Sequence, residues 1–459
     1  MSISYAQLNH PLRIPLAAEI HSRPSLRLRA PEAITHLAVY AKSDSNADTD
    51  NVQLQQEILA SFCTYFGVAC PGGEAKYFFH DFGRFRLKWE CHTEFATYTF
   101  VENANGESVS GHGVAQALTR VPIGHLPEQW LLDLRGKIMV AAHVVLIKNG
   151  NGNGNGNDTD ETPSPIRQTL EGSVLVGSQV LQRGEVWTDF LIQADGFSRF
   201  IVKDQDFLDQ QAGRIVQRLL EIETYRMMAL LGLPHAQKAA PVLAVIENEL
   251  VKLTAAMTLS GGVVTDVAAD GVDTDSEQIL LRQIIDLAAR IEKLSMENNY
   301  RFSASKAYFS LVQSRIEELR EFRIEGVPTI AEFMERRLAP AMNTCEAIVR
   351  RQETLADRIA HTNDLLRTRV GIVQEQQNRK ILQSMNTRAA QQLRLQQAVE
   401  GLSVAAITYY VAGLVQYAGK GLKAVGLQIN PELVTGLLIP LIAGSVWFGL
   451  RRVHQKMQH

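Results

Sequence analysis

The sequence lacks most features that identify an enzyme or a nucleic-acid-binding protein. Its four cysteines, Cys63, Cys70, Cys91 and Cys345, form neither a CxxC pair nor a zinc knuckle, so we expect buried, reduced thiols. No Gly-x-Ser-x-Gly, His-Glu-x-x-His, Walker or protein-kinase motif occurs. The net charge is -3, without a strongly basic block or an RNA-binding aromatic motif, so nucleic acid is not an expected partner. We therefore expect a protein that is not an enzyme.

The N-terminus also lacks a signal peptide. Residues 1–5 are uncharged, and no apolar segment of the kind found in signal peptides follows them. We therefore expect residues 1–400 to stay in the cytoplasm. The chain of 459 residues is long enough to bury two or more hydrophobic cores.

Two uncharged apolar stretches, Gly401–Gly419 and Leu433–Leu450, lie near the C-terminus. Each is about as long as the roughly 20 residues that a helix needs to cross a bilayer. The pattern predicts a two-helix transmembrane hairpin at 401–450. The alternative is a pair of buried helices in a soluble domain, but the lack of charge favours the hairpin.

Basic residues flank the outer sides of both apolar stretches, at Arg388, Arg394, Arg451, Arg452 and Lys456, whereas the connecting loop has Lys420 and Lys423. The positive-inside rule places such flanks in the cytoplasm. We therefore expect a bacterial inner-membrane protein with both termini cytoplasmic and the lipid bilayer as a partner.

The rest of the chain divides into four predicted regions. Residues 1–204 alternate like strands in several places, and the Asn/Gly repeat within them predicts a flexible insertion at 149–165 instead of a phosphate-binding loop. Residues 205–328 have helical spacing, residues 329–400 form a predicted stalk, and 451–459 form a basic tail. The predicted fold class is an α+β cytoplasmic domain followed by a helical, coiled-coil-like stalk and a C-terminal two-helix transmembrane hairpin.

The stalk prediction depends on a 4–3 spacing of mostly apolar residues. The seam comprises Leu338, Met342, Cys345, Val349, Gln352, Ala356, Ile359, Asn363, Leu366, Val370 and Val373. Such a heptad pattern is typical of coiled coils, and we expect a homo-oligomer. Beyond Val373 glutamines accumulate, as expected either for helices gathered around water or for a solvated face.

One candidate metal site lies in the first domain. If Trp89–Phe95 is a strand, Glu90, His92 and Glu94 share one face. Two carboxylates beside an imidazole can hold a divalent cation or orient a polar ligand. A solvent-facing, hydrogen-bonded histidine is the alternative. No other cofactor is expected.

The strand that leads into this motif carries alternating basic residues, Arg84, Arg86 and Lys88. They can attract an anionic ligand or headgroup, or they can form the charged outer face of a hairpin. In the first apolar stretch, Thr408, Tyr409, Tyr410 and Gln416 are polar. Polar groups at that depth need partners, so we expect them to face other helices or a wet pore.

The chain resembles a bacterial family of predicted membrane-anchored proteins, known only as a domain of unknown function. The resemblance is carried by His10–Arg13, Glu19–Pro24, His92–Phe95, Trp187–Phe190, Gln217–Arg226 and Gln397–Ser403. It implies a location and an architecture, and no activity.

The layout is also similar to that of CorA-type metal-ion channels, but their Gly-Met-Asn signature is missing after the first apolar stretch, which ends Gln416-Tyr417-Ala418-Gly419. Our first functional hypothesis is a homo-oligomeric, CorA-like membrane protein linked to cation transport. The alternative is a membrane-tethered scaffold or sensor that binds a cytoplasmic protein or metabolite. A third hypothesis is an enzyme that uses the Glu90, His92 and Glu94 face.

Overall fold

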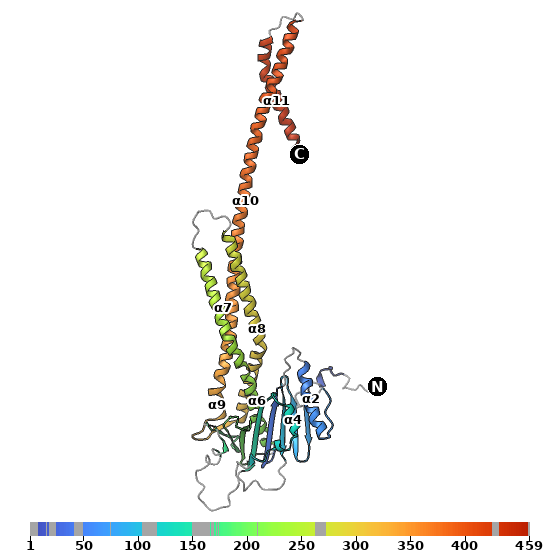
Figure 1. The fold of residues 1–459 in the computed structure, drawn as a ribbon, viewed down its shortest axis with the longest axis vertical. Helices are drawn as coiled ribbons and strands as arrows, with labels where there is room; N and C mark the ends of the chain where they lie inside the picture. The colour runs from blue at the N-terminus through green and yellow to red at the C-terminus, as the bar shows by residue number, and fades with distance from the viewer. Residues whose placement is uncertain are drawn as a thin grey trace, which may run out of the picture. The chain divides into compact units, whose positions relative to one another are not determined.

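The computed structural model describes residues 8–14, 16–17, 24–40, 49–73, 75–102, 117–148, 166, 169–170, 172, 174–208, 210–261, 272–424 and 431–457. The chain forms two compact units. The first comprises Met1–Val263 and Ile285–Ala360, and the second comprises Val264–Ile284 and His361–His459. Figure 1 shows the helices and strands, coloured by residue number. The Asn/Gly repeat and the Glu19–Arg23 segment quoted above lie outside the described residues.

A nine-stranded mixed sheet dominates the first unit, with the strand order β2-β3-β4-β1-β5-β8-β7-β6-β9. Its strands are β1 (Glu32–Val39), β2 (Tyr77–Asp81), β3 (Phe85–Cys91), β4 (Ala96–Glu102), β5 (Ile138–Lys148), β6 (Val176–Val180), β7 (Gly184–Thr188), β8 (Ser198–Asp204) and β9 (Glu321–Arg323). β5 and β8 pair in parallel, whereas β1 pairs antiparallel with both β4 and β5.

Alternation along β1, β3 and β4 gives the sheet one apolar and one mainly polar face. The apolar face carries Leu37, Leu87, Trp89, Tyr98 and Phe100. It packs against α2 (Thr49–Tyr65) and α4 (Glu128–Asp133), where the rings of Phe62 and Trp130 lie 4.9 Å apart. The 3-10 helix η3 (Pro122–His125) precedes α4. This apolar face forms the core that holds the strands in register.

The opposite face of the sheet carries polar side chains under helix α6 (Gln211–Leu230). The imidazole Nε2 of His36 on β1 lies 3.1 Å from the Thr224 hydroxyl on α6. At the start of α6, a Cβ atom on Gly213 would lie 1.7 Å from the carbonyl oxygen of Leu26. Glycine is therefore required there, because the extended segment before β1 crosses the helix at backbone distance.

Three long helices pack together in the first unit: α7 (Gly232–Gly261), the part of α8 (Val272–Leu319) from Ile285, and α10 (Ala339–Ala424) as far as Ala360. Arg351 on α10 pairs with Glu247 on α7 at 2.5 Å, and Arg290 on α8 pairs with Glu249 on α7 at 2.6 Å. A side chain at Gly232 would meet Ser305 of α8 and Cys345 of α10.

About half of the heptad seam predicted from sequence is buried within this chain, and the other seam residues are partly buried. Its buried members in the first unit are Leu338, Met342, Cys345, Gln352 and Ile359. The amphipathic stripe therefore packs against neighbouring helices of the same subunit along this part of α10, as is usual for a surface helix of a globular protein.

The predicted fold class is wrong in its C-terminal part. The structure has no separate stalk followed by a short two-helix hairpin. Instead, a bent helical stretch of 92 residues, Ile330–Gly421, runs through α9 (Ile330–Arg337) and α10 and is interrupted at Leu338, beside Pro340. α10 alone has 86 residues, and α11 (Pro431–Met457) follows it.

The error has a physical reason. Hydropathy detects where the composition changes from polar to apolar, but that change does not interrupt backbone hydrogen bonding. Gly401 stands at the boundary without a helix stop, and a single interior glycine costs a helix only about 1 kcal/mol relative to alanine. The helix therefore continues through the boundary.

In the second unit, α10 stands largely free of other described residues. Arg369 pairs with Glu277 of α8 at 2.7 Å, but every residue from 374 to 399 is exposed. The apolar side chains further along are also exposed, including Leu402, Leu414, Leu437 and Leu441.

Two helical stretches among the described residues are long and apolar enough to cross a membrane by length and composition. They are Gln211–Thr258 and Ile330–Gly421. The most apolar segment of Gln211–Thr258 is 33% buried, because this stretch comprises α6 and part of α7, which pack in the first unit. The most apolar segment of Ile330–Gly421 is 0% buried.

Candidate ligand-binding cavity

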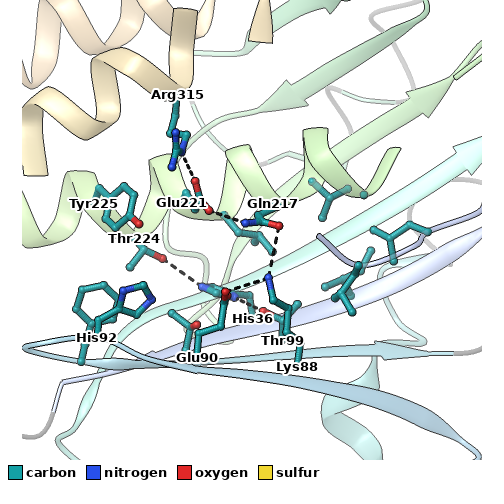
Figure 2. A pocket seen from close by; sticks show the side chains of 18 residues that line it. His36, Lys88, Glu90, His92, Thr99, Gln217, Glu221, Thr224, Tyr225 and Arg315 are labelled. Carbon is teal, nitrogen blue, oxygen red and sulfur yellow. Dashed lines mark hydrogen bonds and ion pairs between the residues drawn. The ribbon is translucent and has the colours of Figure 1, made fainter. Parts of the chain in front are cut away.

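A cavity of about 190 Å³ lies between the polar face of the sheet and α6. Strands β1, β3 and β4 form one wall and α6 forms the other, while Arg315 of α8 and the Leu26–Leu28 segment complete the lining. Figure 2 shows Lys88, Glu90 and Thr99 on the sheet, facing Gln217 and Glu221 of α6.

The alternation of β3 places charged side chains inside this cavity. Trp89 and Cys91 point into the apolar core, so Lys88 and Glu90 face α6. The strand ends at Cys91, and residues 92–95 form a turn that is closed by a 2.8 Å hydrogen bond from His92 N–H to Phe95 O.

Lys88 is the most unusual member of the lining, because only 3% of its side chain is exposed. Its Nζ lies 3.1 Å from Glu90 Oε1 and 3.4 Å from Gln217 Oε1. A buried ammonium is costly unless it is paired and hydrogen-bonded. The Glu90 carboxylate and the Gln217 amide supply that compensation.

His36 lies in the same wall of the cavity, and its own imidazole is neutral. Its Nδ1 is 2.9 Å from the Thr99 hydroxyl, and its Nε2 is 3.1 Å from the Thr224 hydroxyl. Burial, with the nearby Lys88 ammonium, lowers the pKa of His36 from 6.5 to about 3. The imidazole therefore stays neutral at pH 7 and joins the sheet to α6.

Thr97, which also lines the cavity, is 5% exposed, and its Oγ1 has no hydrogen-bond partner among the described residues. Buried hydroxyls are normally hydrogen-bonded, and each exception needs an explanation. Since this hydroxyl borders a cavity, a bound molecule can supply the missing partner.

A chain of polar contacts leads from the cavity to α8. The Gln217 amide donates to Glu221 Oε1 at 2.8 Å, and Arg315 on α8 pairs with Glu221 (Figure 2). Arg315 Nη1 also donates to Glu318 Oε1 at 2.7 Å. The cavity wall is thus connected by ion pairs to a long helix.

Aromatic rings border the other end of the cavity. His92 stacks on Phe95 with ring centroids 4.5 Å apart, and Tyr225 of α6 stacks on Tyr308 of α8 at 5.9 Å. Phe95 and Tyr308 are 6.2 Å apart, so the turn, α6 and α8 meet here.

The structure separates the three residues of the predicted metal site. Glu90 and His92 line the cavity. Glu94 is buried and accepts from Arg301 Nη1 at 3.3 Å, with a second, closer contact from the same guanidinium. This ion pair fixes the turn to α8. Across the described ranges, no group of three or more His, Cys, Asp or Glu side chains could hold a metal ion. A metal site at these residues stays a prediction.

The alternating basic residues also have different environments. Arg84 is exposed, Arg86 pairs with Glu32 and donates to the Arg27 carbonyl at 2.9 Å, and Lys88 is buried in the cavity. Sequence reasoning found Lys88 as an anion-attracting candidate but missed its enclosure.

The polar residues predicted for the first apolar stretch lie on α10. The Thr408 hydroxyl donates to the Val404 carbonyl of its own helix at 2.6 Å. Tyr409 and Tyr410 are exposed, with ring centroids 5.9 Å apart, and Gln416 is partly exposed. Contacts of these residues with other helices or a pore stay predictions.

Sequence reasoning missed most of the cavity. It gave no site role to His36, Thr97, Thr99 and Arg315, and it named Gln217 and Thr224 only within the segment Gln217–Arg226 that carries the family resemblance. The signal that could have found some of them was the position of His36, Thr97 and Thr99, which alternate with apolar residues on their strands. Their shared location depends on strand pairing and on α6, which are not local properties of the sequence.

Fold and cavity together define the class: an α+β protein with a mixed sheet, long helices and a polar cavity under one of them. A family described as "Protein of unknown function (DUF3422)" matches residues 8–457, and the chain belongs to this family. The expected resemblance to an uncharacterised family is thereby confirmed; the match does not extend to CorA-type channels. No curated protein matches the chain.

Replacing Thr97 by valine tests the unpaired hydroxyl. We expect Thr97→Val to raise the free energy of unfolding by about 1 kcal/mol, because it removes an unsatisfied buried polar group while keeping the side-chain shape. The matched control, Thr99→Val, should lower it by about 1 kcal/mol, since the Thr99 hydroxyl bonds His36. Urea unfolding monitored by tryptophan fluorescence measures both. Equal destabilisation by the two variants would contradict this account.

The depressed pKa of His36 predicts acid sensitivity. Below pH 6.5 the unfolded chain binds a proton at this residue, whereas the folded protein does not until about pH 3. Stability is therefore lost as pH falls through this window, by up to about 1.4 kcal/mol per pH unit. His143, whose pKa is lowered to about 4 mainly by burial, acts in the same direction.

His36→Asn isolates the contribution of His36. The variant should be less stable at pH 7 but should show a shallower decline of the unfolding free energy between pH 6.5 and 3. The substitution removes the His36 contribution, whereas the contributions of His143 and of carboxyls with lowered pKa, such as Asp195, remain. Urea titrations at a series of pH values give the slope of the unfolding free energy against pH for the wild type and for the variant. Identical slopes would show that His36 is not responsible for the loss of stability in acid.

Proposed function

We propose that this protein is a membrane-tethered sensor or scaffold whose α+β unit binds a small polar molecule in the cavity under α6. The observation that carries the proposal is the joint presence of an enclosed Lys88 ammonium and an unpartnered Thr97 hydroxyl on one cavity wall. At about 190 Å³, the cavity is smaller than the roughly 300–1,000 Å³ of drug-sized pockets, which favours a small ligand.

The chemistry of the lining supports binding over catalysis. No serine, cysteine or aspartate is among the described residues that line the cavity. His36 has a threonine hydroxyl at each ring nitrogen, so neither nitrogen is directed at a substrate. The Lys88 side chain is held by its contacts with Glu90 and Gln217. These arrangements of His36 and Lys88 suit the orientation of a ligand.

Exposed apolar side chains on α10 and α11 support the proposed contact with a lipid bilayer. Tyr409 is 77% exposed and Leu437 is 76% exposed, and Leu402, Leu414 and Leu441 are similar. Large exposed apolar surfaces on a protein mark interaction sites. Lipid is the occupant that suits uncharged helical stretches of this length, with the basic flanks on the cytoplasmic side of a bacterial inner membrane. Homo-oligomer formation and cation transport stay predictions from the sequence.

A ligand screen tests the cavity. The full-length chain in detergent is heated with a panel of amino acids, carboxylates, amines, sugars and polyols, and the unfolding temperature is measured. We expect at least one compound to raise it, because a ligand that binds only the folded state stabilises that state. The shift should disappear in Lys88→Met.

The control for that screen is Lys203→Met. Lys203 also pairs with a glutamate on a neighbouring strand, Glu185 at 3.6 Å, but it does not line the cavity. Its substitution should leave the ligand-induced shift unchanged. A panel without any Lys88-dependent binder would refute the proposed binding function.

Membrane association is tested by charge insertion. A lysine near the centre of a membrane helix costs about 2.5–3.5 kcal/mol. We therefore expect Leu414→Lys with Leu441→Lys to move the protein from the alkali-resistant membrane fraction toward the soluble fraction. The matched control, Leu382→Lys with Leu393→Lys, changes exposed leucines outside the uncharged stretches and should stay with the membrane. Wild-type protein in the soluble fraction would refute the bilayer assignment.

A further inference from the structure

The charges that line the cavity are balanced. Lys88 and Arg315 are cationic, and Glu90 and Glu221 are anionic, with Lys88 paired to Glu90 and Arg315 paired to Glu221. A ligand with one net charge would leave that charge uncompensated in an enclosed site, which is strongly unfavourable. The lining therefore favours a ligand with no net charge.

The enclosed Lys88 and Glu90 charges favour a zwitterionic ligand over an uncharged one. Burying an ion pair is often no better for stability than burying apolar residues of similar volume. Hydroxyls and amides suffice to bind a sugar or polyol, so such a ligand gives no reason to keep Lys88 and Glu90 beneath α6. A ligand with both an anionic and a cationic group uses both of them.

The strand register places the polar groups in a useful order. Lys88 lies opposite Thr99, and Glu90 lies opposite Thr97, on the antiparallel pair β3 and β4. Thr97, with its unpartnered hydroxyl, is thus the cross-strand neighbour of Glu90. The next residue pair on the same face of the sheet contains Lys88. A carboxylate and an ammonium attached to the same carbon atom of one small molecule suit two protein charges that lie as close together as the Lys88 Nζ and the Glu90 Oε1, 3.1 Å apart.

Part of the cavity lining is apolar. It includes Leu26, Leu28, Ile34 and Val216, and Gly213 allows the Leu26 backbone to approach α6. A ligand with an apolar substituent would bury it there, which contributes roughly 25 cal/mol for each Å² removed from water.

We propose that the ligand is a small zwitterion with an apolar side group, the chemistry of an apolar α-amino acid. Its carboxylate binds Lys88, its ammonium binds Glu90, the Thr97 hydroxyl bonds one of these two groups, and its side group occupies the apolar part near Leu26 and Leu28. This inference rests on the proposed binding function and adds the class of ligand.

Isothermal titration of the full-length chain in detergent tests the class with three probes of one shape. L-Leucine carries both charges, L-leucinamide lacks the carboxylate, and 4-methylpentanoate lacks the ammonium. We expect L-leucine to bind and each single-charge analogue to bind about 30-fold more weakly or worse, because each leaves one buried charge unpaired. L-Serine should also bind more weakly, since it lacks the apolar group. Equal affinity for leucine and either single-charge analogue would overturn the assignment.

Variants then locate the binding. Lys88→Met and Glu90→Gln should each weaken leucine binding by at least about tenfold, and Thr97→Val should weaken it although the variant remains folded. Lys203→Met should bind like the wild type. Unchanged leucine affinity in Lys88→Met would place the molecule elsewhere and overturn the proposal. The analogue series on wild-type protein decides the class even if a variant fails to fold.

The two proposals fail differently. If the screen yields a Lys88-dependent binder that is a sugar, a polyol or a singly charged molecule, and leucine does not bind, the zwitterion class is wrong and the binding function stands. If no compound binds, both are wrong.

Discussion

The ion pair of Lys88 with Glu90 is the interaction on which the functional part of this structure depends. Both residues follow from the alternation of β3, whose other side chains form the apolar core against α2 and α4. Covering the polar face with α6 would be unfavourable if these charges had no partners. Their mutual contact, the Gln217 amide and the threonine-bonded His36 allow α6 to close over charged groups and still leave a cavity.

Sequence alone identified part of the site for a definite reason. Side chains alternate along a strand, and this alternation can be read from a short stretch of sequence. The spacing of Lys88 and Glu90 was therefore enough to place both on one face, and His92 was named as a candidate metal ligand. Glu94 fails the same rule because the strand ends at Cys91, and the turn directs its carboxylate to Arg301 of α8. His36 and Thr224 are 188 residues apart, and no local pattern predicts that they meet.

The helical half shows the same division between local and non-local information. Heptad spacing singled out Leu338, Met342, Cys345 and Ile359, which are buried, but spacing does not tell whether the covering surface belongs to the same chain or to another, and the predicted coiled coil stays a prediction. Here Glu247 of α7 contacts Arg351 between those positions, and Gly232 permits close approach near Cys345. Hydropathy likewise located the apolar stretches, but it led to a prediction of a short hairpin as a separate part, whereas one bent helical stretch, Ile330–Gly421, includes the first of them.

The polar contacts around Gln217 give the cavity a way to affect the helices. The Gln217 carbonyl accepts from Lys88 while its amide donates to Glu221, and Glu221 in turn pairs with Arg315 of α8. In the complex that we propose, a ligand carboxylate on Lys88 competes with the Gln217 carbonyl, and reorientation of that amide alters the hydrogen bond that Glu221 accepts. Arg315 has a second acceptor in Glu318, so it can shift its bonding without being left unpaired. The proposed sensor role requires contacts that differ in free energy between the occupied and the empty site, and this series of residues is our candidate for them.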